Sequence, residues 1–404
     1  MLYRASLRLQ MIFNEILYFT LFLVPAVICF HTCGPRFRPW ILSAFGAAFF
    51  LYFGYLHFGG WFGACCVLFF VWEMLTSRLY RPGSRWCLFG VFQALLVLFA
   101  FKYLAFAASS WNDLASVTGF HHPVHVTHLL LPLGISFFTF EFIHFAVDTY
   151  QGKIERSSLS EYAAFILFFP SMVAGPIKRF QDFLPKLRGA RLDQALLAQG
   201  ITRILVGLVK KHVLADTFAL WATKLNGPEL YTASRSHIGF WILAYGMQIY
   251  LDFSGYSDIA IGSGYLFGIV IPENFSWPYG SRNVAEFWRR WHISLSQWIR
   301  DYVFIPLGGS RHGEARTVVN VLIAFILSGI WHGAAYHFAI WGLWHGMLLI
   351  IHRLWKKWFP RLSAAMPDIL ATSCTFVAVN LGWAFFCMDI RRALFSVSHI
   401  VRLI

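Results

Sequence analysis

Apolar segments recur along the whole chain and predict a bundle of membrane-spanning helices. They cover residues 12–30, 40–58, 61–76, 87–107, 129–147, 162–177, 196–209, 213–224, 238–253, 256–271, 317–331, 334–351 and 369–387. One crossing needs roughly 20 apolar residues and several segments are shorter, so we predict about ten or eleven spans plus re-entrant or interfacial helices. The expected fold class is an all-α, polytopic membrane protein. Because non-helical backbone at membrane depth survives only inside protein or beside water, the short segments also predict an internal cavity.

Composition and charge support this class. Hydrophobic residues make up 58% of the 404 residues and charged residues 13%, whereas soluble domains average about 45–50% and about 25%. The formal net charge of +14 points to membrane topology and anionic lipid rather than to nucleic acid. Some of the same cations are alternative candidates for binding the phosphates of a cytoplasmic donor.

Polar residues enter the apolar segments in the middle of the chain. Glu141, His144 and Asp148 recur at spacings of three and four, so they could share one helix face. A second group comprises Asp252, Ser254, Tyr256 and Asp258. Ionisable residues are costly at membrane depth and mark functional paths. Between the two groups, residues 168–180 hold two prolines and a basic end that includes Lys178, which predicts a broken or re-entrant segment.

Residues 283–311 mix tryptophans with arginines and acidic side chains. This pattern predicts amphipathic helices at a membrane interface, anchored at headgroup depth. The stretch contains Arg289 and Arg290, with His292 in its middle, and the sequence PLGG ends it with a turn.

No metal centre is expected. Four histidines fall within eight residues: His121, His122, His125 and His128. Pro123 disrupts a helix there, and no Cys, Asp or Glu joins them within the octet, so interfacial or loop histidines are the favoured interpretation.

The tripeptide Trp-His-Gly occurs twice in an apolar stretch, at 331–333 and 344–346, with His337 between. A histidine buried without a partner stays neutral because desolvation disfavours the imidazolium, and a neutral imidazole is a competent general base. His332 is favoured because small residues after it leave space beside its ring. On one continuous helix His345 would lie about 20 Å away on roughly the opposite face, so we expect one functional and one structural histidine.

Long motifs resemble the membrane-bound O-acyltransferase family, most closely its alginate O-acetyltransferase branch. These motifs are QIYLDFSGYSDIAIGSGYLFG, IPENFSWPY, EFWRRWHISLSQWIRDYVFIPLGG and SGIWHGAAYHFAIWGLWHG, in the family's order. The resemblance implies a single membrane domain over residues 1–404. Within it, 1–110 would be scaffold helices, 130–350 the catalytic core and 369–404 a C-terminal helix.

The resemblance also implies roles for two histidines. The family's membrane-embedded catalytic histidine corresponds to His332, and its second polar position to His292. In such proteins the two flank a tunnel that an acyl donor enters from the cytoplasm and an acceptor from outside. The implied reaction moves an acyl group, most simply acetyl, from acetyl-CoA or another acyl thioester to a hydroxyl, with no bound cofactor. The implied location is the bacterial cytoplasmic (inner) membrane.

Other polar residues are candidates for supporting roles. An oxyanion on the thioester carbonyl needs donors in a dry site, and the possible donors are Trp331, Ser254 and Tyr256. The residues that would orient a histidine, or only brace helices, are Asp252 and Asp258. The residues that would bind donor phosphates, or lipid headgroups instead, are Arg289, Arg290 and Lys178.

The resemblance implies partners as well, and alternatives stay open. Expected partners are a periplasmic or extracellular acetyltransferase and a polysaccharide acceptor, with an acyl-carrier protein as another possible donor. One alternative reaction is D-alanyl transfer to teichoic acid from a carrier protein. An alternative of another class is a non-catalytic channel or a scaffold for a polysaccharide synthase, in which His332 would not consume a thioester.

Overall fold

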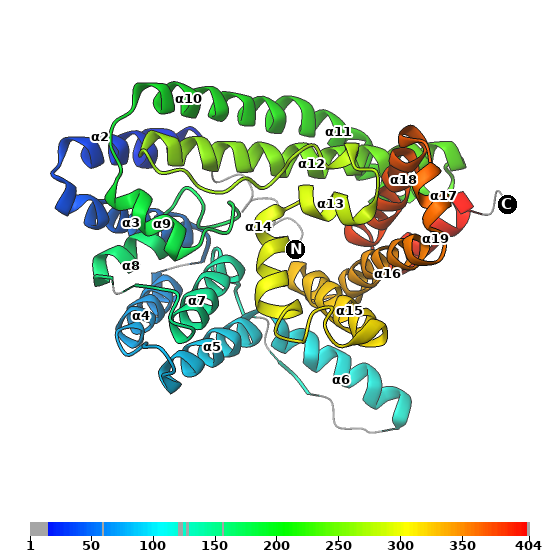
Figure 1. Cartoon of the computed structure of the whole chain (residues 1–404), viewed down its shortest axis with the longest axis horizontal. Helices are drawn as coiled ribbons and strands as arrows, with labels where there is room; N and C mark the ends of the chain where they lie inside the picture. The colour runs from blue at the N-terminus through cyan, green and yellow to red at the C-terminus, as the bar shows by residue number, and fades with distance from the viewer. Residues whose placement is uncertain (1–14, 59, 120–123, 127–128, 156, 402–404) are drawn as a thin grey trace. The chain divides into compact units, whose positions relative to one another are not determined.

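The computed structural model describes residues 15–58, 60–119, 124–126, 129–155 and 157–401, and every regular element in this part is helical (Figure 1). The chain divides into two compact units. The N-terminal unit comprises Met1–Val206 with Tyr256–Pro272, and the C-terminal unit comprises Gly207–Gly255 with Glu273–Ile404. Each unit is therefore built from stretches that are far apart in the sequence. The single membrane domain expected from the sequence stays a prediction.

The N-terminal unit contains most of the first half of the chain. Its helices are α2 (Val24–Thr32), α3 (Arg38–Phe58), α4 (Gly60–Ser77), α5 (Arg85–Leu98), α6 (Leu104–Thr118), α7 (Ile135–Tyr150), α8 (Leu159–Ile166), α9 (Phe180–Arg188) and most of α10 (Gln194–Leu208). Its core is aromatic: Tyr18 and Phe49 are fully buried, and the ring of Phe49 lies 5.7 Å from that of Phe169.

The C-terminal unit is a second helical bundle. Its helices are α11 (Asp216–Ala222), most of α12 (Arg235–Leu266), α13 (Val284–Arg290), α14 (Ile293–Ile299), α15 (Gly313–His332), α16 (Tyr336–Trp358), α17 (Pro360–Ala365), α18 (Asp368–Cys387) and α19 (Ile390–Val401). Helices α15 and α16 form a hairpin whose backbones approach closely. A Cβ on Gly329 would lie 2.1 Å from the carbonyl oxygen of Phe338, so only glycine permits this contact.

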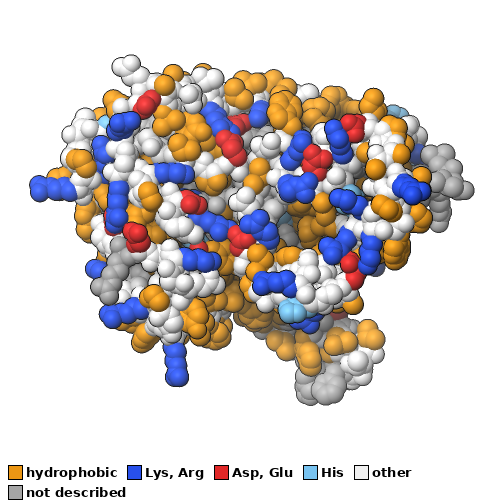
Figure 2. Space-filling view, viewed as in Figure 1, with side chains coloured by type: hydrophobic (Ala, Val, Ile, Leu, Met, Phe, Trp, Pro, Cys, Tyr) orange, Lys and Arg blue, Asp and Glu red, His pale blue; other side chains and the backbone are white. Residues whose placement is uncertain are grey.

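Several helices suit a membrane environment. Within the described residues, four are long and apolar enough to cross a bilayer by length and composition: Pro35–Gly54, Arg85–Thr118, Gly313–His332 and Asp368–Cys387. Tyr18–Thr32 and Cys66–Ser77 are shorter apolar helices. Large apolar side chains such as Leu68 and Ile369 are exposed, and on the face seen in Figure 2 basic side chains clearly outnumber acidic ones. An all-α membrane fold is confirmed, while the number of ten or eleven spans stays a prediction.

One expected boundary is wrong. The sequence suggested separate segments at 238–253 and 256–271, but α12 runs without a break from Arg235 to Leu266. Its glycines allow close packing instead of ending the helix. A Cβ on Gly255 would lie 2.7 Å from the carbonyl oxygen of Gly207, and one on Gly262 would lie 2.6 Å from that of Gly200. Helices α10 and α12 accordingly run side by side (Figure 1).

The broken segment predicted at 168–180 is confirmed, since turns and extended backbone connect α8 to α9. Polar side chains of α7 contact the C-terminal end of this broken segment. Glu141 forms an ion pair with Lys178, and the His144 ring nitrogen Nε2 accepts a hydrogen bond from the backbone N–H of Phe180 at 3.0 Å. One turn further along α7, Asp148 accepts from the Gln181 side chain at 2.9 Å. The predicted shared face of α7 is therefore confirmed, and it contacts residues 178–181.

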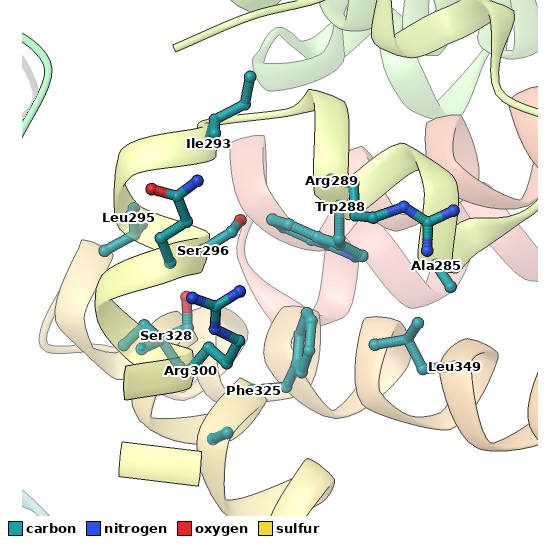
Figure 3. A pocket seen from close by; sticks show the side chains of 13 residues that line it. Ala285, Trp288, Arg289, Ile293, Leu295, Ser296, Arg300, Phe325, Ser328 and Leu349 are labelled. Carbon is teal, nitrogen blue, oxygen red and sulfur yellow. The ribbon is translucent and has the colours of Figure 1, made fainter. Parts of the chain in front are cut away.

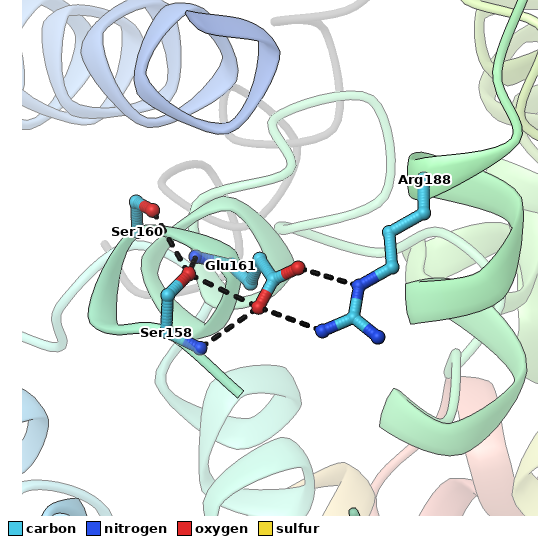
Figure 4. A network of polar contacts seen from close by, with 4 residues as sticks. All are labelled: Ser158, Ser160, Glu161 and Arg188. Carbon is cyan, nitrogen blue, oxygen red and sulfur yellow. Dashed lines mark hydrogen bonds and ion pairs between the residues drawn. The ribbon is translucent and has the colours of Figure 1, made fainter. Parts of the chain in front are cut away.

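The start of α8 is fixed by a polar network (Figure 4). Ser158 and Glu161 form a capping box: the Glu161 N–H donates to Ser158 Oγ at 3.2 Å, and the Ser158 N–H donates to Glu161 Oε2 at 2.8 Å. Arg188 of α9 donates to both carboxylate oxygens, at 2.7 and 3.1 Å. Partial burial would raise the pKa of Glu161, but the hydrogen bonds from Arg188 and Ser158 outweigh it and lower the pKa.

This network makes stability depend on pH. The pKa of Glu161 is lower in the folded state than the value of about 4.3 expected in the unfolded chain. The stabilisation that the ionised carboxylate provides is therefore present above that value, and it is lost as the pH falls through the folded pKa.

Glu161→Gln should therefore lower the free energy of unfolding by about 0.5–1 kcal/mol at pH 7, with a smaller difference near pH 3. Thermal unfolding at both pH values checks this. Glu229→Gln, at an exposed carboxylate without an ion pair among the described residues, is the control; an equal loss at both pH values would contradict the expectation.

Candidate functional site

His332 is the last residue of α15 and lies among aromatic rings of the C-terminal unit. Its ring centroid is 4.7 Å from that of Trp331, 5.2 Å from that of Trp341 on α16 and 5.0 Å from that of Phe386 on α18. The ring is only partly buried. The next residue is Gly333, where a Cβ would lie 2.1 Å from the Phe338 ring, so a larger residue would displace that ring. The site thus combines an accessible imidazole with apolar walls.

His292 lies in the short break between α13 and α14 and is 1% exposed. Its φ of 42° is in the left-handed region, which is rare for a residue with a side chain and is often found at functional sites. Its ring is 4.7 Å from Phe253 and 6.4 Å from Trp331. Trp331 therefore lies next to both histidines. The structure brings together His292, Trp331 and His332, which the sequence predicted from separate motifs.

A cavity of about 370 Å³ in the same unit is lined by Ile293, the residue after His292, but not by His292, Trp331 or His332 themselves (Figure 3). Trp288 of α13 and Phe325 of α15 line its apolar part, and Arg289 and Arg300 lie on either side of these two rings in the view shown. Ser328 also lines it. Because Ser328 and His332 are four residues apart on α15, they occupy the same helix face about 6 Å apart along the axis. Ser328 thus places one wall of the cavity one helical turn before His332 in the chain.

The predicted cations are distributed differently from expectation. Arg289 lines the cavity and has no carboxylate partner among the described residues. Arg290 instead pairs with Glu286 at 2.6 Å. Arg300, which was not among the predicted cations, lines the cavity while its Nε pairs with the neighbouring Asp301 at 2.8 Å.

Lys178 lies in the N-terminal unit, and it is 1% exposed and paired with Glu141. Its ammonium group also lies 4.5 Å from the centre of the Phe165 ring. This placement favours a structural role over binding of donor phosphates, because the charge already has a buried carboxylate and aromatic partners.

The polar residues of α12 brace helices. Asp252 pairs with Lys211, and Asp258 pairs with Arg203 at 2.9 Å, so both carboxylates join α12 to the preceding helical segment. This favours the bracing alternative over orientation of a histidine. Two further candidates, Ser254 and Tyr256, are buried on α12; the oxyanion role suggested for them and for Trp331 stays a prediction.

The second Trp-His-Gly histidine lies closer to His332 than a continuous helix would place it. The chain reverses at 333–335, so His345 lies on α16, and its ring is 5.0 Å from that of Trp341, the same ring that contacts His332. The expected separation of about 20 Å is therefore wrong. His345 is fully buried among aromatic rings, and His337 Nδ1 hydrogen-bonds the Phe385 carbonyl oxygen at 2.9 Å.

No metal centre is found in the part of the chain that the structure describes, where no three histidine, cysteine or acidic side chains gather with metal-binding geometry. His125 is exposed. The other three histidines of the 121–128 cluster, His121, His122 and His128, lie outside the described residues, so their role stays a prediction.

Comparison with known proteins agrees with these observations. The family model "MBOAT, membrane-bound O-acyltransferase family" matches residues 126–391. The chain is 38% identical over 387 residues to the probable alginate O-acetylase AlgI of Pseudomonas aeruginosa, covering 93% of this chain and 72% of that protein. It is 37% identical to the peptidoglycan O-acetyltransferase of Helicobacter pylori, covering 74% and 61%, and 31% identical to the teichoic acid D-alanyltransferase of Bacillus subtilis, covering 79% and 83%.

Proposed function

Because this chain belongs to the membrane-bound O-acyltransferase family, and is thus a multi-pass membrane O-acyltransferase, we propose that it transfers an acetyl group from a cytoplasmic thioester to a hydroxyl of the cell envelope. The single observation that carries this proposal is that the rings of His292, Trp331 and His332 lie together in the C-terminal unit. The acceptor is a polysaccharide, reached directly or through a partner transferase outside the membrane. The proposed location is the bacterial inner membrane.

His332 is the proposed general base. A hydroxyl is a weak nucleophile near neutral pH and needs a base within hydrogen-bonding distance of its proton. The aromatic rings of Trp331, Trp341 and Phe386 around His332 form the walls that hold the imidazole in place. The ring accepts the hydroxyl proton as the oxygen attacks the thioester carbonyl, and the donor's thiol is the leaving group. His292, whose ring lies 6.4 Å from that of Trp331, would position the substrates.

The cavity is the proposed site for the donor's arm. Its rings, Trp288 and Phe325, suit the uncharged pantetheine chain, while Arg289 and Arg300 suit phosphate, because guanidinium groups bind phosphate oxygens through two parallel hydrogen bonds. The proposed donor is acetyl-CoA. No bound cofactor is required for this chemistry.

The donor can be tested with the purified protein in proteoliposomes. Free thiol is followed over time with acetyl-CoA or with a D-alanyl carrier protein, each with and without an oligosaccharide acceptor and a candidate partner transferase. Acetyl-CoA consumption that depends on the acceptor supports the proposal. Consumption of the carrier-protein donor alone would replace it by D-alanyl transfer. If a folded protein consumes neither donor in any sample, a channel or scaffold becomes the better account.

The arginines of the cavity should affect donor binding more than chemistry. We expect Arg289→Gln with Arg300→Gln to raise the KM for acetyl-CoA about 10–100-fold, because each loses a charge-assisted hydrogen bond to phosphate, with little change in kcat. Acetyl-pantetheine, which lacks the phosphates, should be used equally well by the variant and the wild type. Steady-state kinetics with both donors checks this. Arg361→Gln, at an exposed arginine of the same unit, is the control; equal losses with both donors would contradict a phosphate role.

A further inference from the structure

The segment that precedes α13 is fixed to the break that carries His292. Two backbone hydrogen bonds join them: the Ser276 N–H donates to the Arg290 carbonyl oxygen at 3.0 Å, and the Ile293 N–H donates to the Asn274 carbonyl oxygen at 2.9 Å. Asn274 is fully buried between these bonds. This pairing holds His292 in its left-handed conformation, because the residues on both sides of it are fixed.

The side-chain oxygen of Asn274 is shared by three groups of the α14 start. Oδ1 accepts from Ser294 Oγ at 2.6 Å and from the Ser294 backbone N–H at 3.3 Å, and it lies 3.3 Å from His292 Nδ1. A backbone N–H can only donate, so the amide atom that faces it is the oxygen rather than the nitrogen. The backbone therefore fixes the orientation of the Asn274 amide.

The orientation of the amide fixes the protonation of the histidine. Oδ1 is only an acceptor, so the nitrogen that faces it, His292 Nδ1, must carry a proton. A neutral imidazole carries one proton, which leaves Nε2 with a lone pair. Nε2 is buried, and among the described residues it has no hydrogen-bond partner. Three residues that contact the ring, Phe253, Asn274 and Trp331, are uncharged.

We propose that Asn274 is a positioning residue that holds His292 as the Nδ1–H tautomer, so that Nε2 accepts a hydrogen bond from a substrate N–H or O–H group. His292 then cannot donate to an oxyanion through Nε2, and it acts instead as the acceptor opposite His332. This role rests on the proposed acyl transfer, whereas the tautomer itself is a property of the protein that does not depend on its activity.

The tautomer can be measured without a reaction. The protein is labelled with ¹⁵N-histidine and reconstituted in nanodiscs, and the His292 signals are assigned from their loss in His292→Gln. We expect Nδ1 to give the shift of a protonated nitrogen and Nε2 that of an unprotonated one. Asn274→Leu should lose this preference. Asn320→Leu, at another fully buried asparagine of the same unit, is the control and should keep it. A wild-type protein with the proton on Nε2 would overturn the proposal.

Kinetics separates positioning from a purely structural role. Asn274→Leu should lower kcat about 10–100-fold, as for loss of the partner that orients a functional histidine, with a smaller change in donor KM. Asn274→Asp keeps an acceptor for His292 Nδ1, so it should restore part of the kcat that Asn274→Leu loses. Its carboxylate also favours the imidazolium form of His292, so the acid limb of the pH–rate profile should move up by about one pH unit. An unchanged profile in a folded Asn274→Asp protein would overturn the role of Asn274.

If the wild type consumes no thioester but shows the expected tautomer, the proposed function fails while the assignment of the tautomer stands.

Discussion

Purified His332→Ala protein in proteoliposomes is expected to release no measurable thiol from acetyl-CoA. Removing the imidazole leaves the acceptor hydroxyl without a base, and general-base catalysis is worth about 10²–10⁴-fold in rate. The ring packs against Trp341 and Phe386 but is only partly buried, so its loss should leave the bundle folded. The measurement is the initial rate of thiol release at saturating donor and acceptor, together with thermal unfolding of the same samples.

The control for this variant is another histidine of the same hairpin. His337 hydrogen-bonds the Phe385 carbonyl oxygen, which indicates a structural role, so His337→Gln should keep most of the wild-type rate. His332→Gln tests the chemistry further, since a side-chain amide keeps polarity but is not a base. A folded His332→Ala protein that retains the wild-type rate would exclude the proposed mechanism and favour a channel or scaffold.

Breaking the buried ion pair of the N-terminal unit is expected to cause the largest loss of stability. Lys178→Met leaves the Glu141 carboxylate buried without its cation, and such uncompensated charges cost about 3–5 kcal/mol. The expected result is a strong reduction of the unfolding temperature in detergent. It reflects folding rather than phosphate binding, because Lys178 is enclosed by Glu141 and Phe165.

A double replacement separates the two possible roles of this lysine. Glu141→Leu together with Lys178→Met removes both charges, and an apolar pair of similar volume is often neutral or stabilising relative to a buried ion pair. We therefore expect the double variant to regain most of the lost stability and to keep its donor KM. A restored unfolding temperature combined with a much higher KM for acetyl-CoA would instead assign Lys178 to the donor.

The sequence predicts local features well where a periodic pattern or a chain break is enough. The proline-flanked segment 168–180 and the shared face of Glu141, His144 and Asp148 depend on residues that are close in the chain, and the structure confirms both. The continuity of α12 was missed because Ser254 and Gly255 resemble a break. In fact Gly255 allows α10 to approach, which is a contact between helices and leaves no periodic signal.

The partner that a polar side chain contacts is harder to predict from the sequence than the position of a helix or a chain break. The sequence singled out Arg290 beside Arg289, but the helix turns Arg290 toward Glu286 and the cavity wall is completed by Arg300. Asn274 lies in the quoted motif IPENFSWPY and was not singled out, because nothing in a single sequence shows that its amide meets a histidine 18 residues later.

By itself, the sequence determined that this protein is a helical membrane protein of the O-acyltransferase family, and it selected His332 and His292. The apolar segments indicate the membrane helices. The long motifs, through their resemblance to those of the family, indicate the reaction and the two histidines. Only the tertiary structure decided that the Trp331 ring lies near both histidines, that the reversal at 333–335 brings His345 close to His332, and that Lys178 is already paired. The physical reason is that each of these contacts joins separate helices or motifs, and it depends on how their faces pack rather than on the composition of either one.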